Sequence, residues 1–168
     1  EKEMDKVKGK MDLLILESKA SSFDEIEFVT DLTNKGVSKE IVTRLQLLGS
    51  QIKYVANQSI KIGKIILMKL WDFIKENPNL AIGMAIGLGL AVLAGMLLSI
   101  IPFIGTWLAG VIAPIFVIIG AYKGHRLDKI AKGELVSESI VEDTITIVKQ
   151  FWQLLVDIFS SVKDELRD

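Results

Sequence analysis

The sequence contains no cysteine, a single histidine and only three arginines. Without cysteine, the chain has no disulfide framework, no thiolate nucleophile and no sulfur-ligated metal site. A lone histidine, His125, cannot form a metal site by itself, and the sequence holds no H-E-x-x-H pattern, phosphate-binding loop or G-x-S-x-G motif. We therefore expect that the protein is not an enzyme and that it needs no cofactor or metal.

The chain also lacks the excess of positive charge that is typical of nucleic-acid-binding proteins. Its 20 basic and 21 acidic residues give a formal net charge of −1. A nucleic-acid-binding surface usually shows a basic face or stripe, because it has to neutralise phosphates. We therefore expect no direct nucleic-acid partner.

Charge is completely absent from one long segment, residues 77–122, although 24% of the chain is charged. A helix that spans a bilayer needs about 20 mostly apolar residues, so this segment has room for two spans. We expect the first span at 80–100 and the second at 103–122. The resulting fold class is all-α, an integral membrane helical hairpin of two transmembrane helices with additional cytoplasmic amphipathic, coiled-coil-like helices.

This pattern divides the chain into three parts. We expect a cytoplasmic helical region at 1–76, the transmembrane hairpin at 77–122, and a basic connector with a cytoplasmic amphipathic helix at 123–168. The three prolines mark expected helix breaks. Pro78 suits the first turn of the first span, Pro102 suits the turn between spans, and Pro114 is expected to kink the second span.

Small residues recur at four-residue steps in both spans, a spacing that lets helix backbones approach closely in lipid. They are Gly83, Gly87, Ala91 and Gly95 in the first span and Gly105, Ala109 and Ala113 in the second. One such stripe is explained by closure of the hairpin within a chain. A second stripe of Ala81, Ala85 and Gly89 adjoins it, and this surplus favours a homo-oligomer.

Basic residues flank the hairpin on its two outer ends and are absent from its turn. Those at the expected membrane edge are Lys75, Lys123, His125 and Arg126. By the positive-inside rule, both termini are expected on the cytoplasmic side. The bilayer is then the main partner, and the bacterial inner (plasma) membrane is the expected location.

Amphipathic patterns fill the rest of the chain. Residues 1–20 carry an apolar stripe of Met4, Val7, Met11, Leu14 and Leu16, which is expected to pack against later helices. Ser22 and Glu25 have the form of a capping box for a short helix that ends near Gly36. Ser38 is expected to begin a long helix, because apolar residues then alternate at heptad spacing from Ile41 to Ile66.

A second heptad seam lies in the last expected helix, over residues 139–167. Its positions are Val141, Ile145, Val148, Trp152, Leu155, Phe159 and Val162. The seam favours packing on other helices or on a neighbouring subunit. The alternative, a helix lying flat on the membrane, is disfavoured because its polar face is acidic and so has the wrong sign for anionic lipid.

Two family resemblances can be seen. The run from Glu76 to Gly87 resembles the start of the membrane anchor in ElaB/YqjD-type bacterial inner-membrane proteins, which implies a helical arm leading into a glycine-rich span. The apolar hairpin flanked by amphipathic helices looks like a colicin-type pore-forming domain, in which soluble helices cover the hairpin before insertion. Because three or four amphipathic helices are expected to be too few for such a cover, a permanent membrane location is expected.

Two functions remain open. The first is an oligomeric pore or membrane-permeabilising protein, in the manner of a toxin, a holin or an effector of antiviral defence. The second is a non-conducting scaffold or anchor whose cytoplasmic helices dock a partner protein. The small-residue stripes favour the first, whereas the almost complete lack of polar side chains in the spans favours the second.

Overall fold

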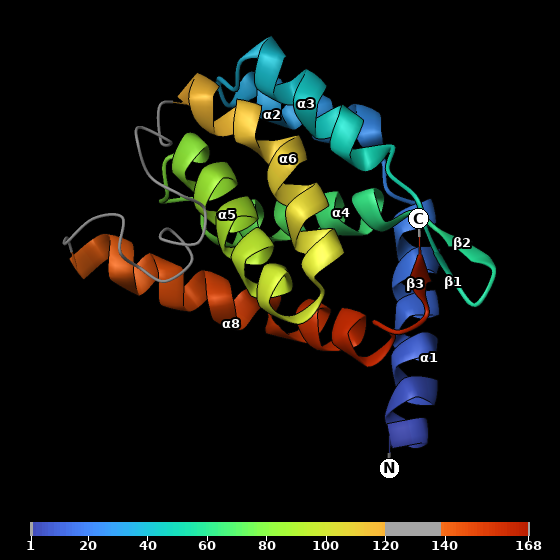
Figure 1. The fold of residues 1–168 in the computed structure, drawn as a ribbon. Helices are drawn as coiled ribbons and strands as arrows, with labels where there is room; N and C mark the ends of the chain where they lie inside the picture. The colour runs from blue at the N-terminus through green and yellow to red at the C-terminus, as the bar shows by residue number, and fades with distance from the viewer. Residues whose placement is uncertain (1, 120–138, 168) are drawn as a thin grey trace.

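The computed structural model describes residues 2–119 and 139–167 of the chain, which are mostly helical. Figure 1 shows a helical assembly with one small sheet at its side. The elements in chain order are α1 (Lys2–Ser21), α2 (Glu25–Asn34), α3 (Lys39–Gly49), β1 (Lys53–Val55), β2 (Gln58–Ile60), α4 (Ile62–Glu76), α5 (Ile82–Ile100), α6 (Pro102–Ile119), α8 (Ser139–Ser161) and β3 (Leu166–Arg167).

Helix α5 lies at the centre of this arrangement. It runs antiparallel to α6, and it also contacts α4 and α8. Helix α3 crosses the other side of α6, while α1 packs on α4 and α8 (Figure 1). The buried apolar side chains of these helices form one continuous core that includes most of α5.

Two expected helix starts can be compared with the structure. Helix α3 begins at Lys39, next to the expected start at Ser38, and Ser38 is its N-cap, since its Oγ accepts the backbone N–H of Ile41 at 3.3 Å. The capping box at Ser22 is wrong. Asp24 is the N-cap of α2 and accepts the N–H of Glu27 at 3.0 Å, whereas Ser22 Oγ donates to the Lys19 carbonyl at the end of α1.

The long helix expected from Ser38 to beyond Ile66 is also wrong. Helix α3 ends at Gly49, a hairpin of β1 and β2 follows, and α4 begins at Ile62. Ala56 and Asn57 form the two-residue turn with φ values of 50° and 69°, as hairpin turns require. Gly63 allows α4 to begin directly against the Leu48 carbonyl of α3, where any Cβ would clash. The two helices therefore cross instead of continuing as one.

A three-stranded antiparallel sheet with the order β2-β1-β3 departs from the all-α prediction. In β1, Lys53 faces Ile60 of β2, while Tyr54 faces Arg167 of β3. Helix α8 ends at Ser161, six residues before the expected end at 167, because the chain turns there to form β3. The sheet therefore joins the last described residues to the segment between α3 and α4.

Of the apolar stripe expected on α1, only Leu16 packs against the core as expected, and it is half-buried. The face of α1 that meets the other helices holds Leu13 and Ala20, with Gly9 directly against Ser161 of α8. Elsewhere on α1, Met4 is 76% exposed and Met11 60% exposed, and Val7 and Leu14 are exposed too. These four residues are thus an uncovered surface of the described structure.

Candidate membrane hairpin

Two helices are long and apolar enough to cross a membrane, by length and composition. They are α5, with 19 residues and a mean hydropathy of 2.2, and α6, with 18 residues and a mean hydropathy of 2.1. The buried core helix of a soluble protein can have the same properties, and α5, of which 61% is buried, fits that description. Helix α6 does not, since only 33% of it is buried.

Close contact between α5 and α6 depends on glycine. A Cβ on Gly87 would meet Ile119 Cδ1 at 2.7 Å, and one on Gly83 would approach the same side chain at 4.0 Å. Near the turn, Gly105 of α6 lies directly against the backbone of Leu98, where no side chain fits. This glycine stripe of α5 therefore faces α6 of the same chain and closes the hairpin.

The adjoining stripe on α5 also meets partners within the chain. Ala85 is buried, and Gly89 lies against Leu70 and Phe73 of α4. The Gly89 carbonyl accepts the indole Nε1–H of Trp152, on α8, at 2.7 Å. Because α4 and α8 contact Gly89, this part of the stripe is not a surplus surface, whereas Ala81, which precedes α5, is exposed.

The remaining small residues lie around the same hairpin. Ala91 is buried in the core, whereas Gly95, Ala109 and Ala113 are half-buried. Pro114 lies inside α6. Pro102 is the first residue of α6 and is exposed, so it follows the turn directly.

The seam of α8 covers α5 and continues onto α1. Five of its side chains are at most 1% exposed, and Ile145 is 3% exposed; the five are Val148, Trp152, Leu155, Phe159 and Val162. Val141 lies in α8, but its side chain is outside the described part. Helices α4, α6 and α8 contact α5 and bury most of it. The described helices leave two thirds of the α6 residues exposed or half-buried, so they do not cover both apolar helices.

The turn of the hairpin meets a buried lysine from the sheet. Lys53 of β1 is only 6% exposed, and its Nζ lies 5.2 Å from the ring centre of Trp107 and 5.9 Å from that of Phe103. An ammonium group over aromatic faces at this range is attracted by the ring quadrupoles. The hairpin turn is therefore held against a positive charge of its own chain.

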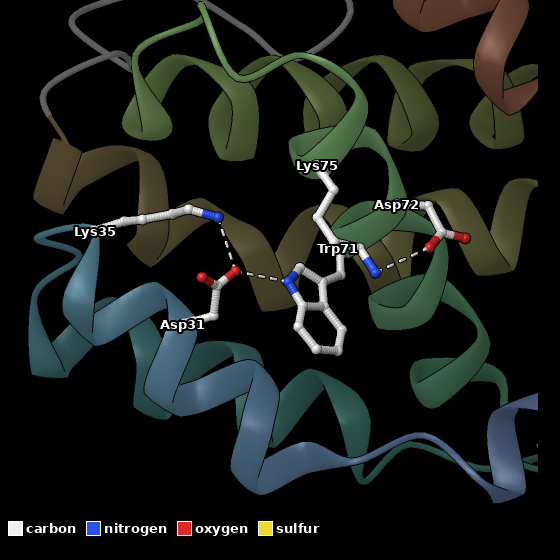
Figure 2. A network of polar contacts seen from close by, with 5 residues as sticks. All are labelled: Asp31, Lys35, Trp71, Asp72 and Lys75. Atoms are coloured by element: carbon white, nitrogen blue, oxygen red, sulfur yellow. Dashed lines mark hydrogen bonds and ion pairs between the residues drawn. The ribbon is translucent and has the colours of Figure 1, made fainter.

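At the opposite end, a polar cluster precedes the apolar segment (Figure 2). The Asp31 carboxylate of α2 accepts the indole N–H of Trp71, on α4, and the Nζ–H of Lys35, both at 2.8 Å. The hydrogen bond from Lys35, more than any other contact, holds the pKa of Asp31 below its ordinary value of 3.8. Lys75 stacks on Trp71 at 4.2 Å and lies 3.8 Å from Asp72. This cluster fixes α2 on α4.

Other predicted residues at this end have different outcomes. Lys75 is exposed at the end of α4, as an edge residue would be, while Lys123, His125 and Arg126 lie outside the described residues. Pro78 does not begin a helix. It lies in the exposed link between α4 and α5, four residues before α5 starts at Ile82. Asn77 ends α4 instead, with its side chain bound to the Phe73 carbonyl.

The described side chains show no arrangement suited to metal chemistry. Within residues 2–119 and 139–167, no three Asp, Glu or His side chains gather closely enough to hold a metal ion.

Comparison with protein-family models, curated proteins and solved structures gives no match, so the functional assignment rests on this chain alone.

Proposed function

We propose that the protein permeabilises a membrane by inserting α5 and α6 as a hairpin, in the manner of a toxin, a holin or an antiviral-defence effector. The observation that carries this proposal is the apolar outer face of α6. Val117 is 69% exposed, and Phe103 and Ile118 are exposed as well. Only a third of the residues of this charge-free helix are buried, and the others are exposed or half-buried, which is costly in water. Such a surface marks a site of interaction with protein or membrane.

Because α4 and α8 pack on α5, insertion of α5 would require these helices to move away from it. Helices α4 and α8 carry charged side chains, among them the half-buried Lys64 and Lys149 and the exposed Asp157. Moving such groups to the centre of a bilayer costs about 2.5–3.5 kcal/mol each. Helix α5 therefore has to separate from α4 and α8 before it spans, and the described arrangement is the form that precedes insertion.

A conducting pore needs more than one copy, because two helices cannot enclose a water-filled channel. The proposed target is the bacterial inner membrane, with both termini on the cytoplasmic side. Residues 80–122 offer few polar side chains, and they include Ser99 and Thr106. A pore of several hairpins would then be lined largely by small residues and backbone.

Dye release from liposomes tests this proposal. Native protein should release the dye, and Gly110→Lys should not. A Cβ at Gly110 meets nothing within 4 Å, so the lysine is tolerated before insertion, but it lies near the middle of α6 and opposes burial in lipid. Ser59→Lys, on an exposed position of β2, is the matched control. Equal dye release by Gly110→Lys and native protein would contradict insertion of α6.

A non-conducting scaffold is the second candidate, and the uncovered stripe of α1 favours it. Met4, Val7 and Met11 recur at three- and four-residue steps, the spacing with which helices dock on one another. A scaffold would float with liposomes but release no dye, whether or not Gly110 is replaced. Native protein that behaves in this way would establish the second candidate in place of the first.

A further inference from the structure

A groove of about 1210 Å³ lies between α3 and α6. One wall comes from α3 and is mostly polar, with the exposed side chains of Lys39, Thr43 and Arg44, and it ends in the apolar Leu47. The other wall comes from α6 and is apolar, with Val117 and Ile118. The groove is therefore amphipathic across its width, with a cationic side facing a hydrocarbon side.

The cationic side has a net positive charge. Lys39 and Arg44 line it together with one carboxylate, that of Glu40. In the part of the chain that the structure describes, neither Lys39 nor Arg44 forms an ion pair. Arginine and lysine bind phosphate oxygens through charge-assisted hydrogen bonds, so this wall suits a phosphate group.

The apolar side also offers one hydrogen-bond acceptor. Pro114 lines the groove and has no N–H, so the carbonyl of Gly110 lacks the donor that would normally follow four residues later. Gly110 lines the groove too, and the space beside its Cα is open.

We propose that the groove between α3 and α6 binds an anionic phospholipid of the bilayer. Its phosphate lies against Lys39 and Arg44, and an acyl chain lies along the Gly110–Ile118 face of α6. This inference rests on the proposed function, because it supposes that the protein meets a membrane. The inference adds that the protein binds an anionic lipid at this groove before α6 inserts.

Filling the groove gives the first test. Gly110→Leu places an apolar side chain in open space, and leucine favours a helix over glycine, so the variant should melt at or above the native temperature. Flotation with phosphatidylglycerol-containing vesicles should show at least about tenfold weaker binding than native protein, because the acyl chain has lost its place. Native-like binding by this folded variant would overturn the proposal.

Charge reversal gives the second test. Each cation near an anionic surface contributes about fivefold to binding, so Lys39→Glu with Arg44→Glu should weaken flotation by about 25-fold or more. The matched control is Lys19→Glu with Lys163→Glu, which changes the net charge equally at exposed positions outside the groove lining. The control should bind within about twofold of native protein. An equal loss in both double variants would assign binding to overall charge and overturn the site.

The absence of cysteine allows a local readout. Thr43→Cys places a unique thiol on the polar wall for an environment-sensitive dye, and Ser59→Cys on β2 is the control position. Anionic vesicles should blue-shift the dye at 43 and leave the dye at 59 unchanged, whereas phosphatidylcholine vesicles and inorganic phosphate should shift neither. A shift with inorganic phosphate alone would identify a phosphate site without lipid and overturn the proposal.

These outcomes separate this site from the proposed function. Dye release that is equal from anionic and neutral vesicles, and unchanged in the Lys39/Arg44 double variant, would sink the lipid site and leave permeabilisation in place. Conversely, anionic vesicles bound through the groove without dye release would support the lipid site and contradict permeabilisation.

Discussion

The indole of Trp152 and the carbonyl of Gly89 are joined by a 2.7 Å hydrogen bond buried between α8 and α5. Gly89 also lets α4 approach the same turn of α5, because a Cβ there would lie 3.1 Å from Leu70. The hydrogen bond ties the helix that would have to span the membrane to the helix that covers it.

Removing this hydrogen bond should weaken the packing of α8 on α5. Trp152→Phe deletes the donor and part of a fully buried side chain, and we expect a loss of about 2 kcal/mol in the free energy of unfolding. Because α5 is then held less tightly, dye release from liposomes should become faster. Trp71→Phe is the control. It also removes an indole hydrogen bond and lowers stability, but the lost bond is to Asp31 of α2 and not to α5.

The cost in free energy of replacing a hairpin glycine by alanine should depend on the space around that glycine, and three positions test this. Gly105→Ala should cost about 1–3 kcal/mol or more, because the backbone of Leu98 cannot move aside. Gly87→Ala should cost less, since its one close neighbour is the flexible end of Ile119, and the Phe116 ring lies at an ordinary contact distance of 3.5 Å. Gly110→Ala, in open space, should stabilise the helix by roughly 1 kcal/mol. Chemical denaturation of the three variants measures this order, and a neutral Gly105→Ala would contradict the close approach of α5 and α6.

Asp31 should make stability depend on acid. Its pKa is lowered in the folded protein, first by the hydrogen bond from Lys35, so the ionised carboxylate stabilises the fold. This contribution is fully present above the ordinary pKa of 3.8 and is lost as the pH falls through the lower folded pKa.

Asp31→Asn provides the measurement. Its free energy of unfolding should lie below the native value at neutral pH, and the two curves should converge in acid, below pH 3.8. Denaturant titrations across this range give the comparison. A difference between the two proteins that grows towards low pH would have the wrong sign for this explanation.

The two sides of α1 should respond differently to substitution. Replacing the exposed Met4, Val7 and Met11 by serine should change the free energy of unfolding by no more than about 0.5 kcal/mol per residue. Leu13→Ala, on the buried face, should cost about 2–5 kcal/mol. Thermal melts of both variants decide the point, and a large loss from the serine variant would show that the stripe is covered after all.

The sequence was most informative where one physical property dominates. The charge-free segment predicts two apolar helices, and α5 and α6 begin within two residues of the expected starts. The helix start at Ser38 was recognised from the apolar spacing that begins at Ile41, and Ser38 is the N-cap of α3. In both cases the relevant residues are neighbours in sequence.

The prediction failed where one segment fits both a helical and a strand pattern. Val55 fits a heptad, but Val55 and Ile60 also fit a buried face of two paired strands, and the deciding partner, β3, lies more than a hundred residues away. The second glycine stripe was misread for a similar reason. Small residues show that something approaches α5 closely, but they do not show that α4 and α8 of the same chain are what approaches.

Strand β1 is the central strand of the sheet, and it contacts two other parts of the protein. One edge of β1 holds β3, which directly follows α8, and its Lys53 holds the rings at the turn between α5 and α6. A pull that peels β3 from Tyr54 therefore acts on the same strand that retains the hairpin turn. Under the proposed insertion, separation of α8 and release of the turn would therefore both act on β1.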